Sequence, residues 1–184
     1  PQKRTVGEIP AFESSAALPS APDLVAMAMP RKNVPGMIDD FGKIGTKAAT
    51  LMSYGFSPAG GDENKAYRKR ILEAAGKYQL RIVGCASLGV MAPYSRLNAG
   101  YARSAPIEGN IAFVAQSGTL VSSVLDWATG RKIGFSHLVS LGDIIDVDFG
   151  DMLDYLAVDG RTRAILLYME QVGQARKFMS AARA

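Results

Sequence analysis

The 184 residues are enough for one large domain or two small ones, and a content of 48% hydrophobic and 21% charged residues excludes a disordered chain. The longest apolar runs, 24–29 and 164–169, are too short to span a membrane, and a single cysteine, Cys85, excludes an internal disulfide and favours a cytoplasmic location. The net charge of +4 is modest, and its densest cluster, 65–70, is typical of a solvated helix face rather than a nucleic-acid surface.

The first half of the chain alternates strand-like and helix-like segments. A buried strand ends at Pro30, and the following helix carries an apolar stripe that includes Val34, Ile38 and Phe41. Glycines and a proline mark 55–61 as a loop. The expected strands are 23–29, 46–52 and 80–83, and the expected helices are 32–45 and 62–78.

A long connection is expected at 84–109, where Gly, Pro, Ser and Asn are frequent and periodicity is weak. The alternation then starts again. The expected strands of the second half are 111–115, 135–141 and 164–169, and the expected helices are 118–130, 149–158 and 174–182. Continuous apolar strands that alternate with helices predict parallel sheets covered on both faces, here in two α/β units that meet near 106–109.

Ligands of parallel sheets gather at the carboxyl ends of the strands, so the loops after the strands are the candidate sites. The sharpest of them is Ser117-Gly118-Thr119, between a buried strand and a helix. A serine-hydrolase elbow is rejected because Thr119 stands where the sharp turn needs glycine, and the only histidine, His137, has the pattern of a packed strand residue. Free N–H groups, small side chains and two hydroxyls favour an anion site, and simple helix capping remains the alternative.

Other chemistry has little support in the residues. The sequence contains neither G-x-G-x-x-G nor a Walker A motif. No metal site is expected, because Asp143, Asp146, Asp148 and Asp151 do not have EF-hand spacing and are better explained as a polar loop that caps the next helix. Cys85 is interpreted as a small buried thiol.

Several strings together resemble a known family. "NIAFVAQSGTLVSSVLDWA", "GFSHLVSLGDIIDVDFGDMLDYLA" and "TRAILLYMEQ" resemble the nucleoside-diphosphate-forming acyl-CoA synthetases, relatives of the succinyl-CoA synthetase α-subunit. "PDLVAMAMP", "LMSYGF" and "LRIVGCASLGVMAP…LNA" resemble the second half of that family's CoA-binding domain. The resemblance implies a partial Rossmann-like CoA-binding domain at 1–106 and a partial flavodoxin-like, succinyl-CoA synthetase-like domain at 107–184.

The resemblance also implies a function. The family converts acyl-CoA to acyl phosphate and then to a phosphohistidine, which phosphorylates ADP or GDP. Coenzyme A or acyl-CoA would be bound by this chain, and ADP or ATP by an ATP-grasp domain or subunit outside it. In this interpretation Ser117, Gly118 and Thr119 hold the phosphoryl group, and Glu170 orients the phosphorylated imidazole. The loops that pass along the coenzyme would contain Met29, Pro30, Ser53, Gly55 and Phe56.

Three departures from the family keep a second function open. The glycine-rich turn of the CoA-binding domain would precede Pro1, the phosphohistidine would follow Ala184, and Ala86 stands where the family has an asparagine near the reacting carbonyl. The segment alone is therefore expected to be inactive. The alternative is an acyl-CoA-sensing regulatory region joined to a GNAT domain in a protein lysine acetyltransferase. The acyl group, the nucleotide and homo-oligomer formation are left open, and neither a nucleic acid nor a membrane is expected as a partner.

Overall fold

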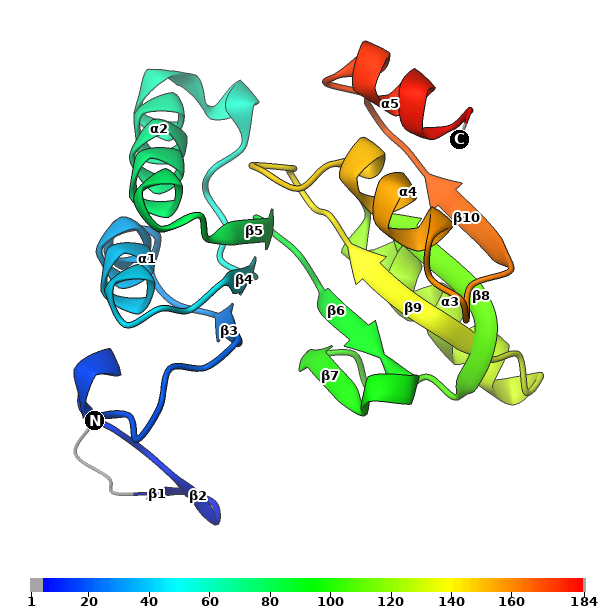
Figure 1. Ribbon diagram of the computed structural model, residues 1–184, viewed down its shortest axis with the longest axis horizontal. Helices are drawn as coiled ribbons and strands as arrows, with labels where there is room; N and C mark the ends of the chain where they lie inside the picture. Colours follow the sequence, from blue (N-terminus) through cyan, green and yellow to red (C-terminus); the bar gives the residue numbers. More distant parts are fainter. Residues whose placement is uncertain (1–4, 184) are drawn as a thin grey trace.

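A computed structural model describes residues 5–183 and arranges them in two α/β units, the first built on a parallel sheet and the second on a sheet whose core strands β10, β8 and β9 are parallel (Figure 1). The first sheet has the strand order β3-β4-β5 and the second the order β10-β8-β9-β6-β7. The expected fold class is confirmed: parallel strands alternate with helices in both units. No helix within residues 5–183 is long and apolar enough to cross a membrane.

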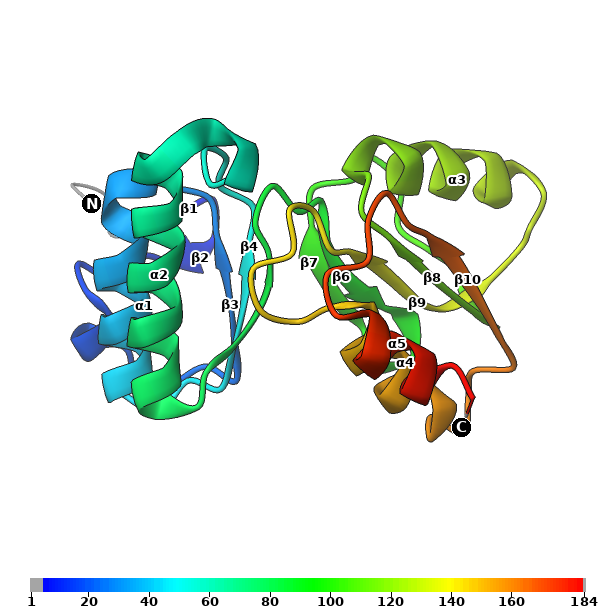
Figure 2. The same ribbon diagram turned by 90° about the horizontal axis from the view of Figure 1, so that it is seen from above.

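The first unit packs two helices on one face of its three-stranded sheet (Figure 2). Its regular elements are β3 (Leu24–Met27), α1 (Val34–Lys43), β4 (Ala48–Leu51), α2 (Gly61–Tyr78) and β5 (Arg81–Gly84). The apolar stripe of α1 points into the core, where Val34 and Ile38 are fully buried with Ile71 of α2. Because apolar residues recur with helical spacing, they form one face of α1, and the helix buries this apolar face and exposes its polar face.

The second unit has helices on both faces of its five-stranded sheet, α3 on one and α4 with α5 on the other (Figure 2). Its elements are β6 (Gly89–Ala92), β7 (Leu97–Gly100), β8 (Glu108–Ala115), α3 (Gly118–Gly130), β9 (Phe135–Ser140), α4 (Phe149–Ala157), β10 (Ala164–Tyr168) and α5 (Ala175–Ala181). β8 pairs in parallel with both β9 and β10, so the carboxyl ends of these three strands meet at one edge.

Two parts of the chain differ from the expectation. An N-terminal hairpin of β1 (Thr5–Val6) and β2 (Ile9–Pro10) was not expected, because two-residue strands leave no periodic signal. The interpretation of 84–109 as an irregular connection is wrong: it contains the β6–β7 hairpin and the first residues of β8.

The β6–β7 hairpin is antiparallel and pairs with β9 of the second sheet. At Gly89 the backbone has φ +121°, and a Cβ there would collide with the backbone of Ala99. In a sequence, a glycine that is needed where two strands approach closely cannot be told from a glycine in a loop, which explains the wrong interpretation of 84–109. The chain changes sheets between Gly84 and Gly89, while the division into domains at 106/107 stays a prediction.

The connecting loop, residues 142–148 of the second unit, runs alongside the end of β5 and is hydrogen-bonded to the first unit. The amide groups of Asp143, Ile145 and Val147 donate hydrogen bonds of 2.8, 2.8 and 3.0 Å to carbonyls at 85, 84 and 82 of the first unit. Arg68 of α2 donates to the carbonyl of Ile144 at 2.7 Å. As expected, the aspartates of this loop include a helix cap: Asp148 forms a capping box at the start of α4.

Candidate functional site

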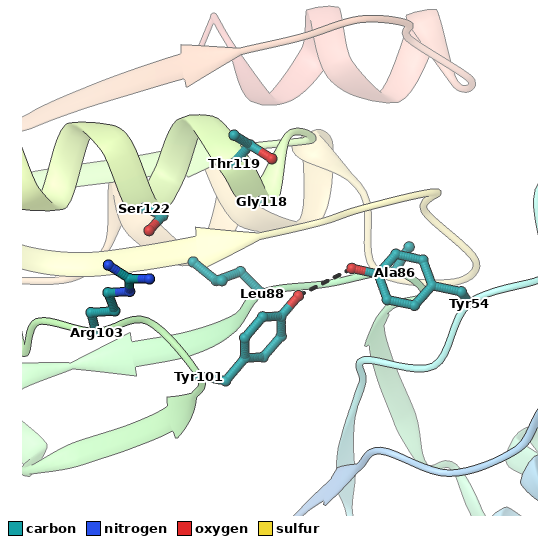
Figure 3. Close-up of a pocket in the computed structure, with 8 residues that line it drawn as sticks. All are labelled: Tyr54, Ala86, Leu88, Tyr101, Arg103, Gly118, Thr119 and Ser122. Carbon is teal, nitrogen blue, oxygen red and sulfur yellow. Dashed lines mark hydrogen bonds between the residues drawn. The ribbon is translucent and has the colours of Figure 1, made fainter.

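Two adjoining pockets lie where the carboxyl ends of the strands of both units face each other. The first, of about 520 Å³, is called the loop pocket here, and the second, of about 410 Å³, the helix pocket. The loop pocket is lined by Ala28, Met29, Pro30, Met52, Ser53, Tyr54 and Tyr101. The helix pocket is lined by Tyr54, Ala86, Leu88, Tyr101, Arg103, Gly118, Thr119 and Ser122 (Figure 3).

The loop pocket is shaped by Ser53, which ties together the ends of β3 and β4. Its hydroxyl donates to the carbonyl oxygen of Met29 at 2.7 Å and accepts from the Met29 amide at 3.0 Å. Ser53 is only 6% exposed, and both of these bonds go to the backbone. Its side chain therefore holds the loop at Met29 and Pro30 in place, and the loop itself lines the pocket.

Gly55 and Phe56 follow Tyr54 in the chain but line neither pocket. The Phe56 side chain is fully buried and packs edge-on against Tyr67, with 6.2 Å between ring centroids. Gly55 has φ +92°, and a Cβ there would lie 3.1 Å from the Cδ of Arg31. The backbone conformation alone accounts for glycine at 55. Of the five residues expected along the coenzyme, the fold brings together Met29, Pro30 and Ser53.

The helix pocket begins at the first turn of α3. Ser117 caps this helix, because its hydroxyl accepts a hydrogen bond of 3.2 Å from the amide of Leu120, while Gly118 and Thr119 line the pocket. A Cβ at Gly118 would lie 3.2 Å from the Cβ of Leu88, so a larger residue would crowd the pocket wall. The capping interpretation is thus confirmed for Ser117, and the anion interpretation stays a prediction for the exposed start of the helix.

Glu170 is held beside the start of α3 by a residue that the sequence analysis did not single out. The side-chain oxygen of buried Gln116 accepts hydrogen bonds from the amides of Glu170 and Gln171, at 2.7 and 2.9 Å. Gln116 directly precedes Ser117, and β10 pairs with β8 up to Tyr168 and Ala115. A polar residue at the end of an apolar strand was the available signal, since a buried amide needs partners.

Tyr54 lies in a loop that was expected along the coenzyme but was not itself singled out, and Tyr101 was missed; within residues 5–183 these two are the only residues that line both pockets. Their hydroxyl oxygens are 3.2 Å apart, and the two side chains point toward one another (Figure 3). The hydrogen bond with Tyr54 raises the pKa of Tyr101 to about 12, so the phenol stays protonated at neutral pH. Tyr101 was missed because it lies in 84–109, which the sequence analysis interpreted as an irregular connection.

The electrostatics of the helix pocket suit an anion. Arg103 is the one charged residue among those that line it; the Ser122 hydroxyl points toward Arg103 from α3, and Thr119 lines the pocket from the first turn of the same helix (Figure 3). The first turn of a helix adds unpaired N–H groups and the positive end of the dipole. Within residues 5–183 no group of three or more His, Cys, Asp and Glu side chains is placed to hold a metal ion.

His137 and Cys85 lie outside both pockets, in keeping with the packed roles expected for them. His137 is on β9, with its Nδ1 3.7 Å from an Asp159 carboxylate oxygen and its Nε2 3.4 Å from the Tyr155 hydroxyl. Burial lowers the pKa of His137, which favours the neutral imidazole. The side-chain partners of His137 are thus Tyr155 and Asp159, and His137 does not act as a base for the Cys85 thiol.

The Cys85 thiol is expected to resist alkylation until the protein unfolds. Cys85 is fully buried, and burial, with a smaller effect of the Asp143 charge, raises its pKa to about 12. Because the thiolate is the reactive form, a disulfide reagent such as DTNB should label the native protein far more slowly than the same protein in guanidinium chloride. Equal labelling rates under both conditions would contradict the buried position.

Comparisons with known proteins agree with this architecture. Residues 1–93 match the family model "CoA binding domain", and residues 108–184 match "Succinyl-CoA ligase like flavodoxin domain". The chain is 37% identical over 183 residues to the ADP-forming acetate–CoA ligase I of Archaeoglobus fulgidus, covering 100% of this chain and 27% of the relative. It is 35% identical to the α-subunit of the Pyrococcus furiosus ADP-forming acetate–CoA ligase I, covering 94% of this chain and 37% of the subunit.

Solved structures show the same likeness. A protein from Pyrococcus horikoshii OT3 matches with a TM-score of 0.93 and 32% identity, over 99% of this chain and 42% of that one. The apo "dinucleotide forming Acetyl-coenzyme A synthetase 1" of Ca. Korarchaeum cryptofilum matches with a TM-score of 0.91 and 30% identity, over 98% of this chain and 39% of that one. The chain thus spans well under half the length of these relatives. It belongs to the family of CoA-binding, succinyl-CoA ligase-like proteins that includes the ADP-forming acetate–CoA ligases.

Proposed function

We propose that this chain is the acyl-CoA-binding part of an ADP-forming acyl-CoA synthetase, and that the helix pocket holds the phosphate of that reaction. The observation that carries the proposal is the continuity of the two pockets. Residues expected along the coenzyme line one, residues expected at the phosphate line the other, and the two pockets share a wall at Tyr54 and Tyr101. A thioester held in the first pocket would have its acyl end beside the second.

Each pocket offers what its part of the substrate requires. The backbone at Met29 and Pro30, fixed by Ser53, gives the coenzyme a rigid edge at the carboxyl ends of β3 and β4. The start of α3, with Thr119 and Arg103, offers hydrogen-bond donors and positive charge to a phosphate. Holding both reactants in adjoining sites supports transfer of the acyl group from sulfur to phosphate oxygen.

Glu170 is assigned to the next step, because a carboxylate would not help to bind a bare phosphate. Two negative charges repel, and Glu170 follows the strand beside the one that leads into α3. A carboxylate at this place would orient an imidazole brought in by a segment outside residues 5–183. An ATP-grasp domain or subunit would then supply the ADP, as the succinyl-CoA synthetase-like fold implies.

The function is tested with the full-length protein. Incubated with acetyl-CoA, phosphate and ADP, it should form ATP and free CoA, and omission of any one of the three should stop both products. Calorimetry with CoA gives a second readout that does not depend on turnover. Absence of both CoA binding and ATP formation would overturn the proposal.

A regulatory acyl-CoA-binding role is the second candidate, and Ala86 is the observation that favours it. Ala86 lines the helix pocket with a methyl group and has no side-chain donor for a reacting carbonyl. In that role the chain would sense acyl-CoA on behalf of a GNAT domain in the same protein. CoA binding without phosphate-dependent ATP formation would decide in its favour.

A further inference from the structure

We propose that the hydroxyl groups of Tyr54 and Tyr101 together supply the hydrogen bond that holds and polarises the thioester carbonyl of the acyl-CoA. The inference rests on the proposed function, since it assumes that a thioester crosses from the loop pocket to the helix pocket. It assigns a catalytic role to two residues that come from different units, Tyr54 after β4 and Tyr101 after β7.

The position of the pair follows from the two pockets. The coenzyme enters along Met29 and Pro30, and the phosphate lies at the start of α3. The bond that must be broken, between the acyl carbon and the sulfur, lies between these two groups. Among the residues that the structure describes, only Tyr54 and Tyr101 are common to both linings, so their hydroxyls lie where the thioester crosses.

The hydrogen bonding of the pair leaves one donor available. Each phenol carries one O–H donor, and in a bond of 3.2 Å between two hydroxyls only one of the two protons is used. The second proton is free to reach a ligand, and its donor is polarised by the bond within the pair. With a raised pKa, Tyr101 is protonated at neutral pH and is not available as a general base.

The chemistry requires such a donor. A phosphate oxygen attacks the acyl carbon, a C–O bond forms, and the carbonyl electrons move onto its oxygen. When the carbonyl re-forms, the C–S bond breaks and the proton of the hydrogen phosphate passes to the leaving thiolate, which gives acyl phosphate and CoA. A donor aimed at the carbonyl oxygen stabilises the negative charge on that oxygen.

The other residues of the pocket are less suited to this role. Ala86 has no donor, and Ser117 uses its hydroxyl as the acceptor of the helix cap. Arg103 lies beside Ser122, at the end of the helix pocket away from Tyr54, where it is better placed for the phosphate (Figure 3). The tyrosine pair is therefore the donor nearest to the loop pocket.

Infrared spectroscopy of bound acetyl-CoA tests the inference without turnover. With a 13C label at the acetyl carbonyl, the C=O stretch of the complex with the full-length protein should lie below that of acetyl-CoA in water. Tyr54→Phe and Tyr101→Phe each leave one hydroxyl, so each should retain part of the shift, and the double variant should lose it. Tyr94→Phe, whose ring packs against Arg161 outside both pockets, is the matched control and should keep the full shift.

Kinetics give the second readout. The double variant should lose roughly 100- to 1,000-fold in kcat, the range for loss of an oxyanion donor, with unchanged CoA affinity, and each single variant should lose much less. An unshifted carbonyl stretch in the wild type, or the same stretch in wild type and double variant when calorimetry shows that both bind acetyl-CoA, would overturn the inference alone. Failure of the wild type to bind acetyl-CoA would overturn the proposed function, and the inference with it.

Discussion

Thr119→Asp is expected to abolish phosphate use by the full-length protein while its fold remains intact. Thr119 is exposed in the first turn of α3 and lines the helix pocket. A carboxylate there would lie about 4 Å from a bound phosphate, and at an effective dielectric of about 20 the repulsion is about 4 kcal/mol per pair of unit charges. Since 1.4 kcal/mol is a tenfold change, phosphate affinity should fall about 1,000-fold.

The helix itself should tolerate this change. An acidic residue in the first turn interacts favourably with the helix dipole by about 0.3–1 kcal/mol, so the melting temperature should stay the same or rise. Thr119→Asn is the matched control, because it has the same shape as the aspartate variant without its charge. Phosphate titrations with ADP and acetyl-CoA, together with thermal unfolding, measure both effects. If the two variants depend on phosphate concentration in the same way, phosphate does not bind at the start of α3.

Gly142→Ala is expected to cause the largest loss of stability among the single changes considered. Gly142 has φ +55°, and a Cβ there would overlap the carbonyl oxygen of Cys85. That carbonyl accepts the 2.8 Å hydrogen bond from Asp143, the first of the bonds that fix the connecting loop along β5. Left-handed backbone for alanine costs about 1–2 kcal/mol and overpacking about 1–3 kcal/mol, so we expect a loss of roughly 2–5 kcal/mol.

Gly45→Ala separates these two contributions. Gly45 has φ +101°, yet nothing lies within 4 Å of an added Cβ, so its replacement introduces backbone strain without a collision. Chemical unfolding followed by fluorescence should show a clearly larger loss for Gly142→Ala than for Gly45→Ala. If both variants lose the same amount, the contact with Cys85 contributes nothing and the connecting loop is not held as described.

Local patterns in the sequence were enough to predict most of the regular elements. The helix α1, the strand β9, and the helices that begin after Ser117 and Asp148 all fall within two residues of their expected bounds, and β8 starts three residues early. Such features depend on neighbours within about one helical turn or one strand, and capping residues mark the ends. The same strings carried the family resemblance, which the comparisons confirm.

The residues that make up the candidate site were harder to predict from the sequence than the regular elements. The position of Phe56 after a glycine turn is compatible with a side chain against a ligand or inside the core, and only packing against Tyr67 decides for the core. Met29, Pro30, Gly118 and Thr119 were singled out because strand ends are known ligand positions and because the family resemblance implies ligand contacts there. Gln116 was not, although its amide sets the backbone of Glu170.

The sequence by itself determined the family and, outside the two hairpins, the alternation of strands and helices, and it predicted which loops face a ligand. Only the tertiary structure decided that the β6–β7 hairpin belongs to the second sheet, and that Tyr54 and Tyr101, 47 residues apart, meet at the wall between two pockets. The physical reason is the range of the interactions. Helix and strand periodicity is repeated along the chain, whereas a contact between distant residues leaves no local pattern and forms only when two units pack together.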